Sequence, residues 1–254
     1  MYTDEELEQL EQEEFDLTTE EFLLLLLLLT ELHDNVEKEI TRFYQKYGKD
    51  GVVTYQEARK WVSNKDHRKR LFVLFFAITD SFDKSFKALE KEFNSHLSKL
   101  IGMEKEFFNM DIDDIEKLLN TKWGIENLSW LDRLYNHRSK WNGVINNELK
   151  KAMLQRKSIN EILEELETKF KGMEKALWNL YTTESSAINS ITRKELFSGL
   201  GVKKYRFYAR VDERMCESCG ELHGQVFPMT AYEIGVTASP IHPRCRCWEV
   251  PIME

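Results

Sequence analysis

The chain has 254 residues, of which 42% are hydrophobic and 31% charged, and its formal net charge is −8. This composition can build a core in one large domain or in two smaller ones. The acidic balance argues against a non-specific nucleic-acid binder, which usually presents a basic block to the phosphates, and the acidic start of the chain lacks the basic region of a secretory signal.

The first segment is strongly acidic, because residues 1–35 contain twelve acidic and no basic side chains. Like charges that are not compensated repel one another, so we expect residues 1–17 to form an acidic flexible arm. This arm either moves freely or docks as a helix on a basic partner. Thr18 and Thr19 can cap the first long helix, whose opening turn is again acidic.

A run of seven leucines, Leu23 to Leu29, follows the predicted cap. With Phe22 it makes eight consecutive apolar residues, whereas a membrane span needs about twenty. The run therefore predicts a fully buried helix turn or a partner-binding helix, and no membrane span.

A helical body is predicted over residues 18–179, where proline is absent and apolar residues recur at helical spacing. Two capping boxes, in which a hydroxyl residue precedes a glutamate by three positions, mark further helix starts. The expected helices cover about 18–48, a short segment from the box of Thr54 and Glu57, 67–100 with Gly102 at its end, 111–120, 129–156, and a last helix or helix pair from the box of Ser158 and Glu161 to Gly199.

The pattern changes after Gly201, where "KKYRFYARV" at 203–211 alternates polar and apolar residues as a strand does. Residues 225–229 and 247–252 predict two more short strands. The expected fold class is therefore mainly α: an elongated helical N-terminal body with a small C-terminal α+β module.

All four cysteines lie in this module, within "MCESC" and "IHPRCRC". Tetrahedral zinc needs four Cys or His ligands, and five candidates are present. A metal could hold a module that is too small to be stable by hydrophobic burial alone. We therefore expect one structural zinc, with ligands from Cys216, Cys219, His242, Cys245 and Cys247.

Three other interpretations of these residues stay open. Two disulfides match the cysteine count but not a reducing cytosol. A nucleophilic pair of Cys245 and His242 would not need three further cysteines nearby. A catalytic zinc would need a general base such as Glu221 or His223, yet no H-E-x-x-H or H-x-E pattern is present. We expect no catalytic residues.

The order of the module's residues resembles the C-terminal module of the phage minor head proteins typified by the F protein of phage Mu. "LYTTESSAINS" at 180–190 is similar to the Arg-Thr-Glu helix of that family, with Thr182 where an arginine is usual. The resemblance covers residues 180–252, and we take 180–254 as the module. The matching positions are Asp212, Cys216, Cys219, Leu222, Gly224, Val226, Phe227, Pro240, His242, Pro243, Cys245, Arg246 and Cys247.

The resemblance implies a minor capsid protein that is assembled in the bacterial host cytoplasm and becomes part of the virion. Such proteins lie inside the capsid near the portal, so the implied partners are the portal protein, other head proteins and packaged DNA. The implied roles are head assembly, DNA packaging or DNA ejection, and no enzyme activity is expected.

Two alternatives remain beside this function. One is an enzyme carried in the virion, either a toxin-like ADP-ribosyltransferase or a zinc-dependent hydrolase, although the helical N-terminal part lacks the β-rich pattern of such a transferase. The other is a DNA-contacting protein, for which the near-neutral module gives weak support.

Overall fold

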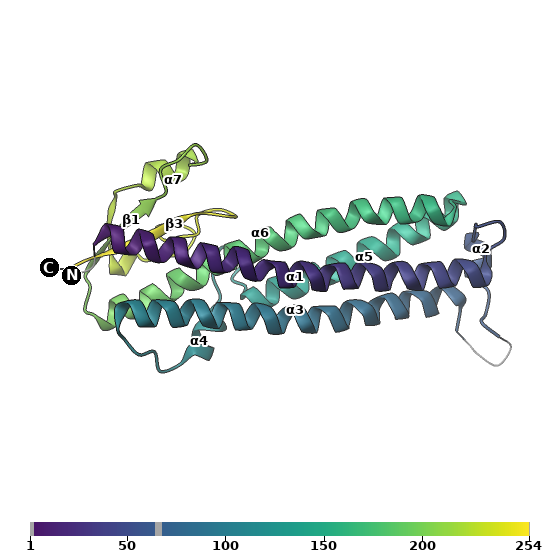
Figure 1. Ribbon diagram of the computed structural model, residues 1–254, viewed down its shortest axis with the longest axis horizontal. Helices are drawn as coiled ribbons and strands as arrows, with labels where there is room; N and C mark the ends of the chain where they lie inside the picture. Colours follow the sequence, from purple (N-terminus) through teal and green to yellow (C-terminus); the bar gives the residue numbers. More distant parts are fainter. Residues whose placement is uncertain (1–2, 64–67, 254) are drawn as a thin grey trace. The chain divides into compact units, whose positions relative to one another are not determined.

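The computed structural model describes residues 3–63 and 68–253 (Figure 1). Contacts divide the chain into two compact units. The first unit contains residues 1–23, 92–133 and 178–254, and the second contains residues 24–91 and 134–177. The helices of the described residues are α1 (Asp4–Tyr47), α2 (Tyr55–Ala58), α3 (Arg70–Phe108), α4 (Ile115–Leu119), α5 (Trp130–Gln155), α6 (Ile159–Gly199) and α7 (Glu217–Leu222), and the strands are β1 (Lys204–Ala209), β2 (Val226–Pro228) and β3 (Cys247–Ile252).

The predicted capping box at Ser158 is confirmed, and so is the predicted cap at Thr54, although the Glu57 carboxylate there pairs with Lys60 and Arg70. Thr54 Oγ1 accepts a hydrogen bond from the backbone N–H of Glu57 at 3.2 Å and caps α2. Ahead of α6, Glu161 Oε2 accepts from the backbone N–H of Ser158 at 2.7 Å, and Ser158 Oγ accepts from that of Glu161 at 3.4 Å. These reciprocal bonds satisfy backbone donors that have no partner within the helix.

The predicted start of the first long helix at Thr18 is wrong, because α1 begins at Asp4. Leu7, Leu10 and Glu14 lie on one buried helical face, with 0%, 5% and 2% of their surface exposed. A third capping box explains the early start: Thr3 Oγ1 accepts from the backbone N–H of Glu6 at 3.1 Å, and Glu6 Oε2 accepts from that of Thr3 at 2.8 Å.

The predicted helix end at Gly102 is also wrong, because α3 continues to Phe108. Glycine inside a helix costs about 1 kcal/mol relative to alanine. Buried side chains on both sides of Gly102, namely Ile101 and Phe108, favour the continued helix. Their burial outweighs that cost, at about 1.5–3 kcal/mol for each large apolar side chain.

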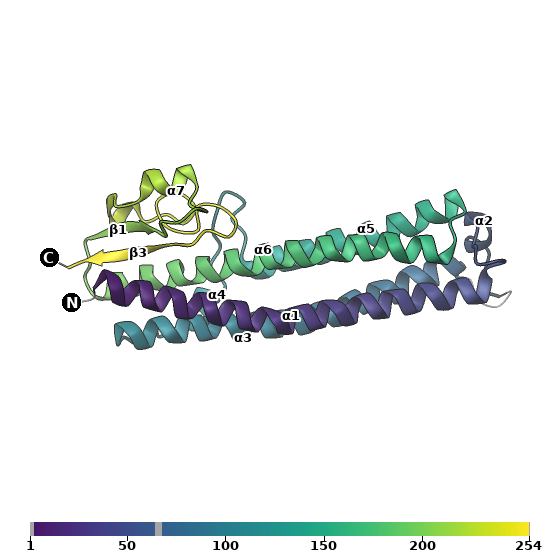
Figure 2. The same cartoon turned by 45° about the horizontal axis from the view of Figure 1, so that its top comes forward.

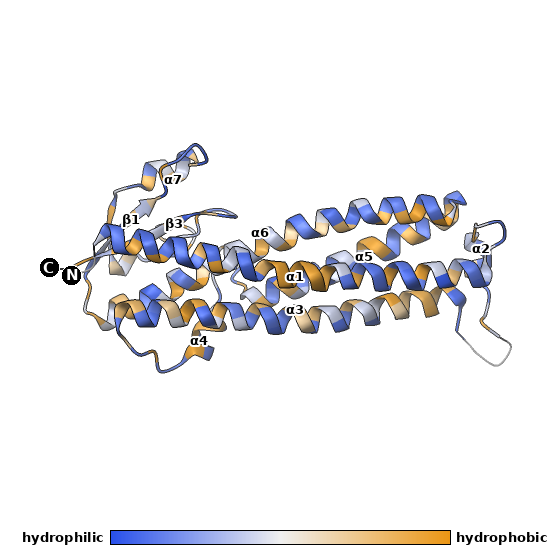
Figure 3. Ribbon diagram, in the orientation of Figure 1, coloured by the Kyte–Doolittle hydropathy of each residue, from blue (hydrophilic) through white to orange (hydrophobic). Residues whose placement is uncertain are grey.

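The leucine run is only partly buried. Leu25 and Leu29 are 1% exposed, whereas Leu23 and Leu27 are 61% and 67% exposed. The run forms the orange stretch in the middle of α1 in Figure 3. The expectation of a fully buried turn is therefore wrong for this run. Among the described residues, no helix is both long and apolar enough to cross a membrane.

Aromatic packing fills the core of the second unit. The rings of Phe86 and Trp141 meet edge to face at 5.7 Å between centroids, and His33 stacks on Phe170 at 4.2 Å. The loop before α2 joins this core through the backbone N–H of Ile159, which donates to the carbonyl of Gly51 at 3.1 Å. The loop of residues 48–54 is thus held against the start of α6 within this unit.

The first unit contains a three-stranded antiparallel sheet in the order β2-β1-β3. One core cluster joins this sheet to helical residues and includes Leu7, Phe108, Phe197, Tyr205 and Trp248. Figures 1 and 2 both show the start of α1 beside β1 and β3. The predicted class, mainly α with a small C-terminal sheet, is confirmed, and all named strands of the described residues lie after residue 203.

A buried carboxylate attaches β3 to α6. Glu249 is 0% exposed. Its carboxylate accepts from the backbone N–H of Ser239 at 2.6 Å and from Ser190 Oγ at 3.0 Å, and the Tyr232 hydroxyl lies 3.1 Å from it. Hydrogen bonds from three segments offset the cost of burying this group.

A second buried network surrounds Arg193 of α6, which is 1% exposed. Its guanidinium lies 2.6 Å from Glu104 and 3.5 Å from Glu14, and it also pairs with Glu11. Burial raises the pKa of Glu11 to about 7 and raises the pKa of Glu14 and Glu104 above their usual range. One arginine therefore serves three carboxyl groups, which favours a proton on at least one of them.

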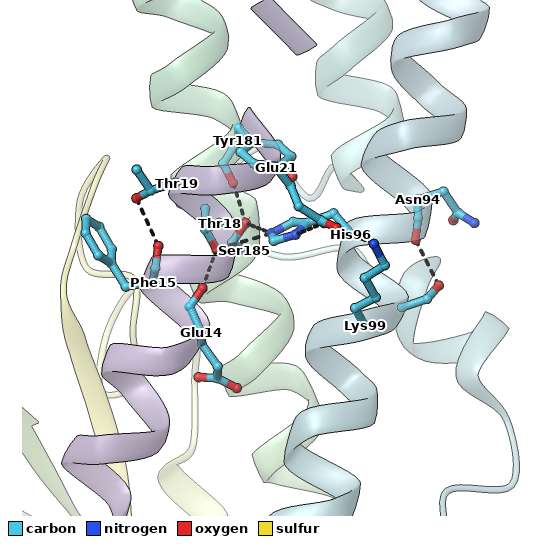
Figure 4. A network of polar contacts seen from close by, with 11 residues as sticks. Glu14, Phe15, Thr18, Thr19, Glu21, Asn94, His96, Lys99, Tyr181 and Ser185 are labelled. Atoms are coloured by element: carbon cyan, nitrogen blue, oxygen red, sulfur yellow. Dashed lines mark hydrogen bonds and ion pairs between the residues drawn. The ribbon is translucent and has the colours of Figure 1, made fainter. Parts of the chain in front are cut away.

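A third network lies around the buried side chain of His96 (Figure 4). Its Nδ1 is 2.9 Å from Glu21 Oε2, and its Nε2 is 3.0 Å from Ser185 Oγ and 3.2 Å from Thr18 Oγ1. Burial lowers the pKa of His96 to about 4, although Glu21 opposes this shift. The imidazole is therefore neutral at pH 7.

Candidate metal centre

Two segments of the C-terminal module carry the five predicted ligands. Cys216 is the N-cap of α7, and its Sγ accepts from the backbone N–H of Cys219 at 3.4 Å. The second segment leads into β3, where the backbone N–H of Cys245 donates to the carbonyl of His242 at 3.1 Å. Cys247 is the first residue of β3. A helix turn and a tight turn thus present the ligands.

The structure brings all five predicted residues into two overlapping groups. Cys216, Cys219 and His242 have their ligand atoms within 4.8 Å of one another, and so do Cys219, Cys245 and Cys247. Cys219 belongs to both groups: its Sγ lies 3.7 Å from Cys245 Sγ and 3.3 Å from His242 Nε2. This cluster could hold a metal ion.

A backbone contact orients the imidazole of His242. Its Nδ1 lies 2.9 Å from the carbonyl oxygen of Pro243. An N–H at Nδ1 donates to this oxygen and leaves the lone pair at Nε2, which faces the sulfur of Cys219. Such second contacts fix the tautomer and the ring orientation of histidines that bind metals.

Hydrogen bonds among the thiols favour one thiolate. Bonds from Cys219 and then from Cys247 lower the pKa of Cys245 to about 3, against the effect of burial. The bond to Cys245 is the largest cause that raises the pKa of Cys219 and of Cys247. The backbone N–H of Cys219 lowers the pKa of Cys216. Thiolate is the form of cysteine that binds metals.

Two alternative interpretations of the cysteines, disulfides and a catalytic zinc, find less support. All four cysteines are free thiols, and the 3.7 Å between Cys219 and Cys245 is far above the roughly 2.05 Å of a disulfide. His223 Nδ1 accepts from the backbone N–H of Ala209 at 3.1 Å, which ties it to β1. Glu221 is exposed, and neither it nor His223 belongs to a metal-ligating group within residues 3–63 and 68–253.

A cavity next to the cluster was missed by the sequence reasoning. It has a volume of about 530 Å³ and is lined by residues of α1, α6, the segment between β1 and α7, and the segment that leads into and begins β3. His242, Cys245 and Cys247 form part of its wall. The sequence signal for this cavity was the group of closely spaced arginines in the module. The α1 residues that complete the cavity wall lie about 200 positions earlier in the sequence.

Comparison with known proteins supports the resemblance that the motif suggested. The model of the family described as "Phage Mu protein F like protein" matches residues 143–250. The match therefore begins within α5, whereas the resemblance of the motif begins at residue 180 and covers residues 180–252.

A relative from Haemophilus influenzae, titled "Uncharacterized protein", is 28% identical over 118 residues. The aligned part is 46% of this chain and 26% of the relative, so the chain spans about a quarter of that protein's length. No solved structure matches the chain. Residues 143–250, which hold the whole cysteine cluster, are thus similar to the Phage Mu protein F like family.

Proposed function

We propose that the protein is a structural component of a phage head that acts in head morphogenesis. The observation that carries this proposal is the family match over residues 143–250, which includes all five candidate ligands. Leu7 of α1, Phe197 of α6 and Trp248 of β3 share one buried core, which holds the small sheet on the helices as a rigid support for docking surfaces.

Within the virion, the proposed place is the inside of the capsid near the portal vertex. The proposed partners are the portal protein, other head proteins and packaged DNA. The proposed roles are head assembly, DNA packaging or DNA ejection. The protein would be made in the bacterial host cytoplasm and incorporated before the head is filled.

Mass spectrometry of purified phage particles tests this function directly. We expect the protein in DNA-filled particles and in empty heads, and we expect it to co-purify with the portal protein after the heads are disrupted. A phage that carries a stop codon early in this gene should yield fewer infectious particles. Protein that is abundant in the lysate but missing from every head fraction would contradict the proposal.

A structural zinc ion is the second part of the proposal. A Zn–S bond of about 2.3 Å gives about 3.8 Å between two sulfurs at tetrahedral corners. The Cys219 and Cys245 sulfurs lie 3.7 Å apart, which agrees with that edge. For a sulfur and a histidine nitrogen the same geometry gives about 3.6 Å, and the distance from Cys219 Sγ to His242 Nε2 is 3.3 Å.

The zinc would link the turn before α7 to the start of β3. Four of the five candidates close a tetrahedral site and leave no position for water, which is typical of structural rather than catalytic zinc. Five single Cys→Ser or His→Ala variants identify the ligands, since the variant of the residue that is not a ligand keeps one zinc per chain. If all five variants keep their zinc, the cluster is not the site.

A further inference from the structure

The cavity beside the metal cluster contains groups that the proposed metal does not use. Its walls include Phe15 and Thr18 of α1, Trp178 and Ser185 of α6, and Arg244 of the segment before β3. All its lining residues belong to the first unit. Its volume of about 530 Å³ is within the usual range for ligand sites, about 300–1,000 Å³.

Arginines supply the positive charge of this cavity. Four of them line it, and no lysine does. Arg210 Nη2 donates to Gln12 Oε1 at 2.7 Å, and Arg246 is paired with Asp212. Arg214 and Arg244 are exposed and form no ion pair with any described residue. A guanidinium matches a carboxylate or a phosphate with two parallel hydrogen bonds, so these two arginines favour an anionic ligand.

Three buried lining residues have polar atoms without a hydrogen-bond partner among the described residues: Trp248 Nε1, Asn189 Oδ1 and Glu14 Oε1. These side chains are 2%, 7% and 2% exposed. Asn189 Nδ2 donates to Glu14 Oε2 at 2.7 Å, so the amide oxygen is the Asn189 atom that has no hydrogen-bond partner. An unsatisfied buried polar group destabilises the folded protein, and a ligand with suitable atoms would relieve that cost.

The kind of atom that is unsatisfied distinguishes between anionic ligands. Trp248 offers a donor, whereas Asn189 offers an acceptor oxygen. A fully ionised phosphate group carries only acceptors and could satisfy Trp248 and the arginines, but it brings no donor for the Asn189 oxygen. A peptide carries both N–H and C=O groups along its backbone, and acidic side chains add the carboxylates.

We propose that this cavity binds a short peptide segment of another protein, with acidic side chains facing Arg214 and Arg244 and its backbone facing Trp248 and Asn189. This inference rests on the proposed function of a protein that docks on other head proteins, and it specifies the chemistry of the partner. Phe15 and Trp178 supply apolar wall for a hydrophobic residue between the acids.

Titration of the purified, zinc-loaded protein with defined peptides tests the proposal. The first probe is acetyl-Asp-Phe-Asp-Gly-amide, the second has Asn in place of both Asp residues, and the third is inorganic pyrophosphate. Isothermal calorimetry measures affinity, and tryptophan fluorescence reports on Trp178 and Trp248. We expect the acidic peptide to bind roughly tenfold more tightly than the Asn peptide and than pyrophosphate, a difference of about 1.4 kcal/mol.

Variants identify the binding groups. The double change Arg214→Ala and Arg244→Ala should weaken the acidic peptide roughly tenfold and abolish its preference over the Asn peptide. Trp248→Phe, which removes only the N–H donor and part of the ring, should weaken both peptides. Arg42→Ala, an exposed arginine of the second unit, is the matched control and should leave binding unchanged.

Three results would overturn the inference. Equal affinity for the acidic and the Asn peptide would show that the arginines do not select charge. Binding of pyrophosphate in preference to either peptide would indicate a phosphate site. No saturable binding up to about 1 mM of the acidic peptide, with a zinc-loaded and folded protein, would show that the cavity is not a peptide site. None of these results bears on whether the protein is present in phage heads, so the two proposals fail separately.

Discussion

Asp212 and Arg246 form a two-bond ion pair across the C-terminal module, with Nη1 and Nη2 of the arginine 2.6 and 2.7 Å from the two carboxylate oxygens. Arg246 lowers the pKa of Asp212 to about 2, helped by the backbone N–H of Arg214. The pair joins the segment before α7 to the start of β3. The cysteines lie in those two segments and in the first turn of α7, so a salt bridge and a candidate metal site link neighbouring parts of the chain.

Asp212→Asn should weaken metal binding. The change keeps the size of the side chain but removes the charge that holds Arg246 between Cys245 and Cys247. Loss of a group that orients a ligand typically costs 10- to 100-fold in metal affinity, and we expect about tenfold here. Competition with a coloured zinc chelator measures this. Asp111→Asn, whose side chain is 97% exposed, is the control and should have no effect.

The double change Cys216→Ser and Cys219→Ser should remove the zinc. We expect about one zinc per chain in the unmodified protein and none in the variant, measured by elemental analysis after purification without chelator. The last 50 or so residues should then become sensitive to protease, because metal binding supplies much of the folding free energy of small modules. The helices of the second unit should resist digestion as before.

A resistant C-terminal module in zinc-free protein would contradict the structural role of the metal. Cys→Ser changes also alter packing, since Cys219 is 3% exposed. Removing zinc from the unmodified protein with a chelator separates the two effects, because it leaves the side chains in place.

Arg193→Met should strongly destabilise the protein at pH 7. The change leaves three glutamates in a buried site without their cation, and breaking a buried ion pair in this way costs about 3–5 kcal/mol. Urea unfolding followed by circular dichroism measures the free energy. The loss should shrink as the pH falls, because the carboxyl groups then bind protons. Arg42→Met, at an exposed arginine, is the control.

His96 should make the protein less stable in mild acid. Its pKa is about 4 in the folded protein, mainly because it is buried, whereas an unperturbed histidine has a pKa of 6.5. Between these values the unfolded chain binds a proton that the folded chain does not. The free energy of unfolding therefore falls as the pH falls through this window. His96→Gln should flatten that dependence, as measured by urea unfolding from pH 4 to 7.

Glu184 provides the opposite case and serves as a comparison for His96. Its carboxylate accepts from Trp123 Nε1 at 2.9 Å and lies 3.2 Å from Arg133, and burial raises its pKa to about 7. The folded protein then holds a proton that the unfolded chain releases. The stabilisation that Glu184 adds to the free energy of unfolding is therefore present below pH 4.5 and lost as the pH rises to 7. Glu184→Gln should remove that slope. A change of slope in the same direction for both variants would contradict these assignments.

Local signals predicted most of the helices and all three strands. The boxes at Thr54 and Ser158 and the alternation at 203–211 are short-range patterns, and short-range contacts decide those elements. The early start of α1 was missed although Thr3 and Glu6 form the same kind of box. The many acidic side chains of this segment favoured a flexible arm over a helix that starts at this box. The residue that pairs with the buried Glu14, Arg193, lies 179 residues away.

The ligand cluster could be predicted because cysteine spacing is local and no other cysteines compete. The cavity could not, since its arginines meet Phe15 and Thr18 only after the chain has folded back. The division into residues 1–17, 18–179 and 180–254 remains a prediction, and so does the mobility of residues 1–17. Hydrogen exchange of the free protein tests the latter: protection from Leu7 onward, which the burial of that residue favours, would contradict the mobile arm.

The contact of residues 4–23 of α1 with the C-terminal module has a consequence for synthesis on the ribosome. Gln12 bonds to Arg210, 198 residues later in the chain. At about 5–20 residues per second, the first helix waits roughly 10–40 s for its partner surface to emerge. During this interval its apolar face is only partly covered, because Phe108 of α3 emerges before the module, and the dense negative charge beside that face repels other nascent chains. We therefore expect the acidic residues of this segment to limit aggregation of the growing chain before it can fold.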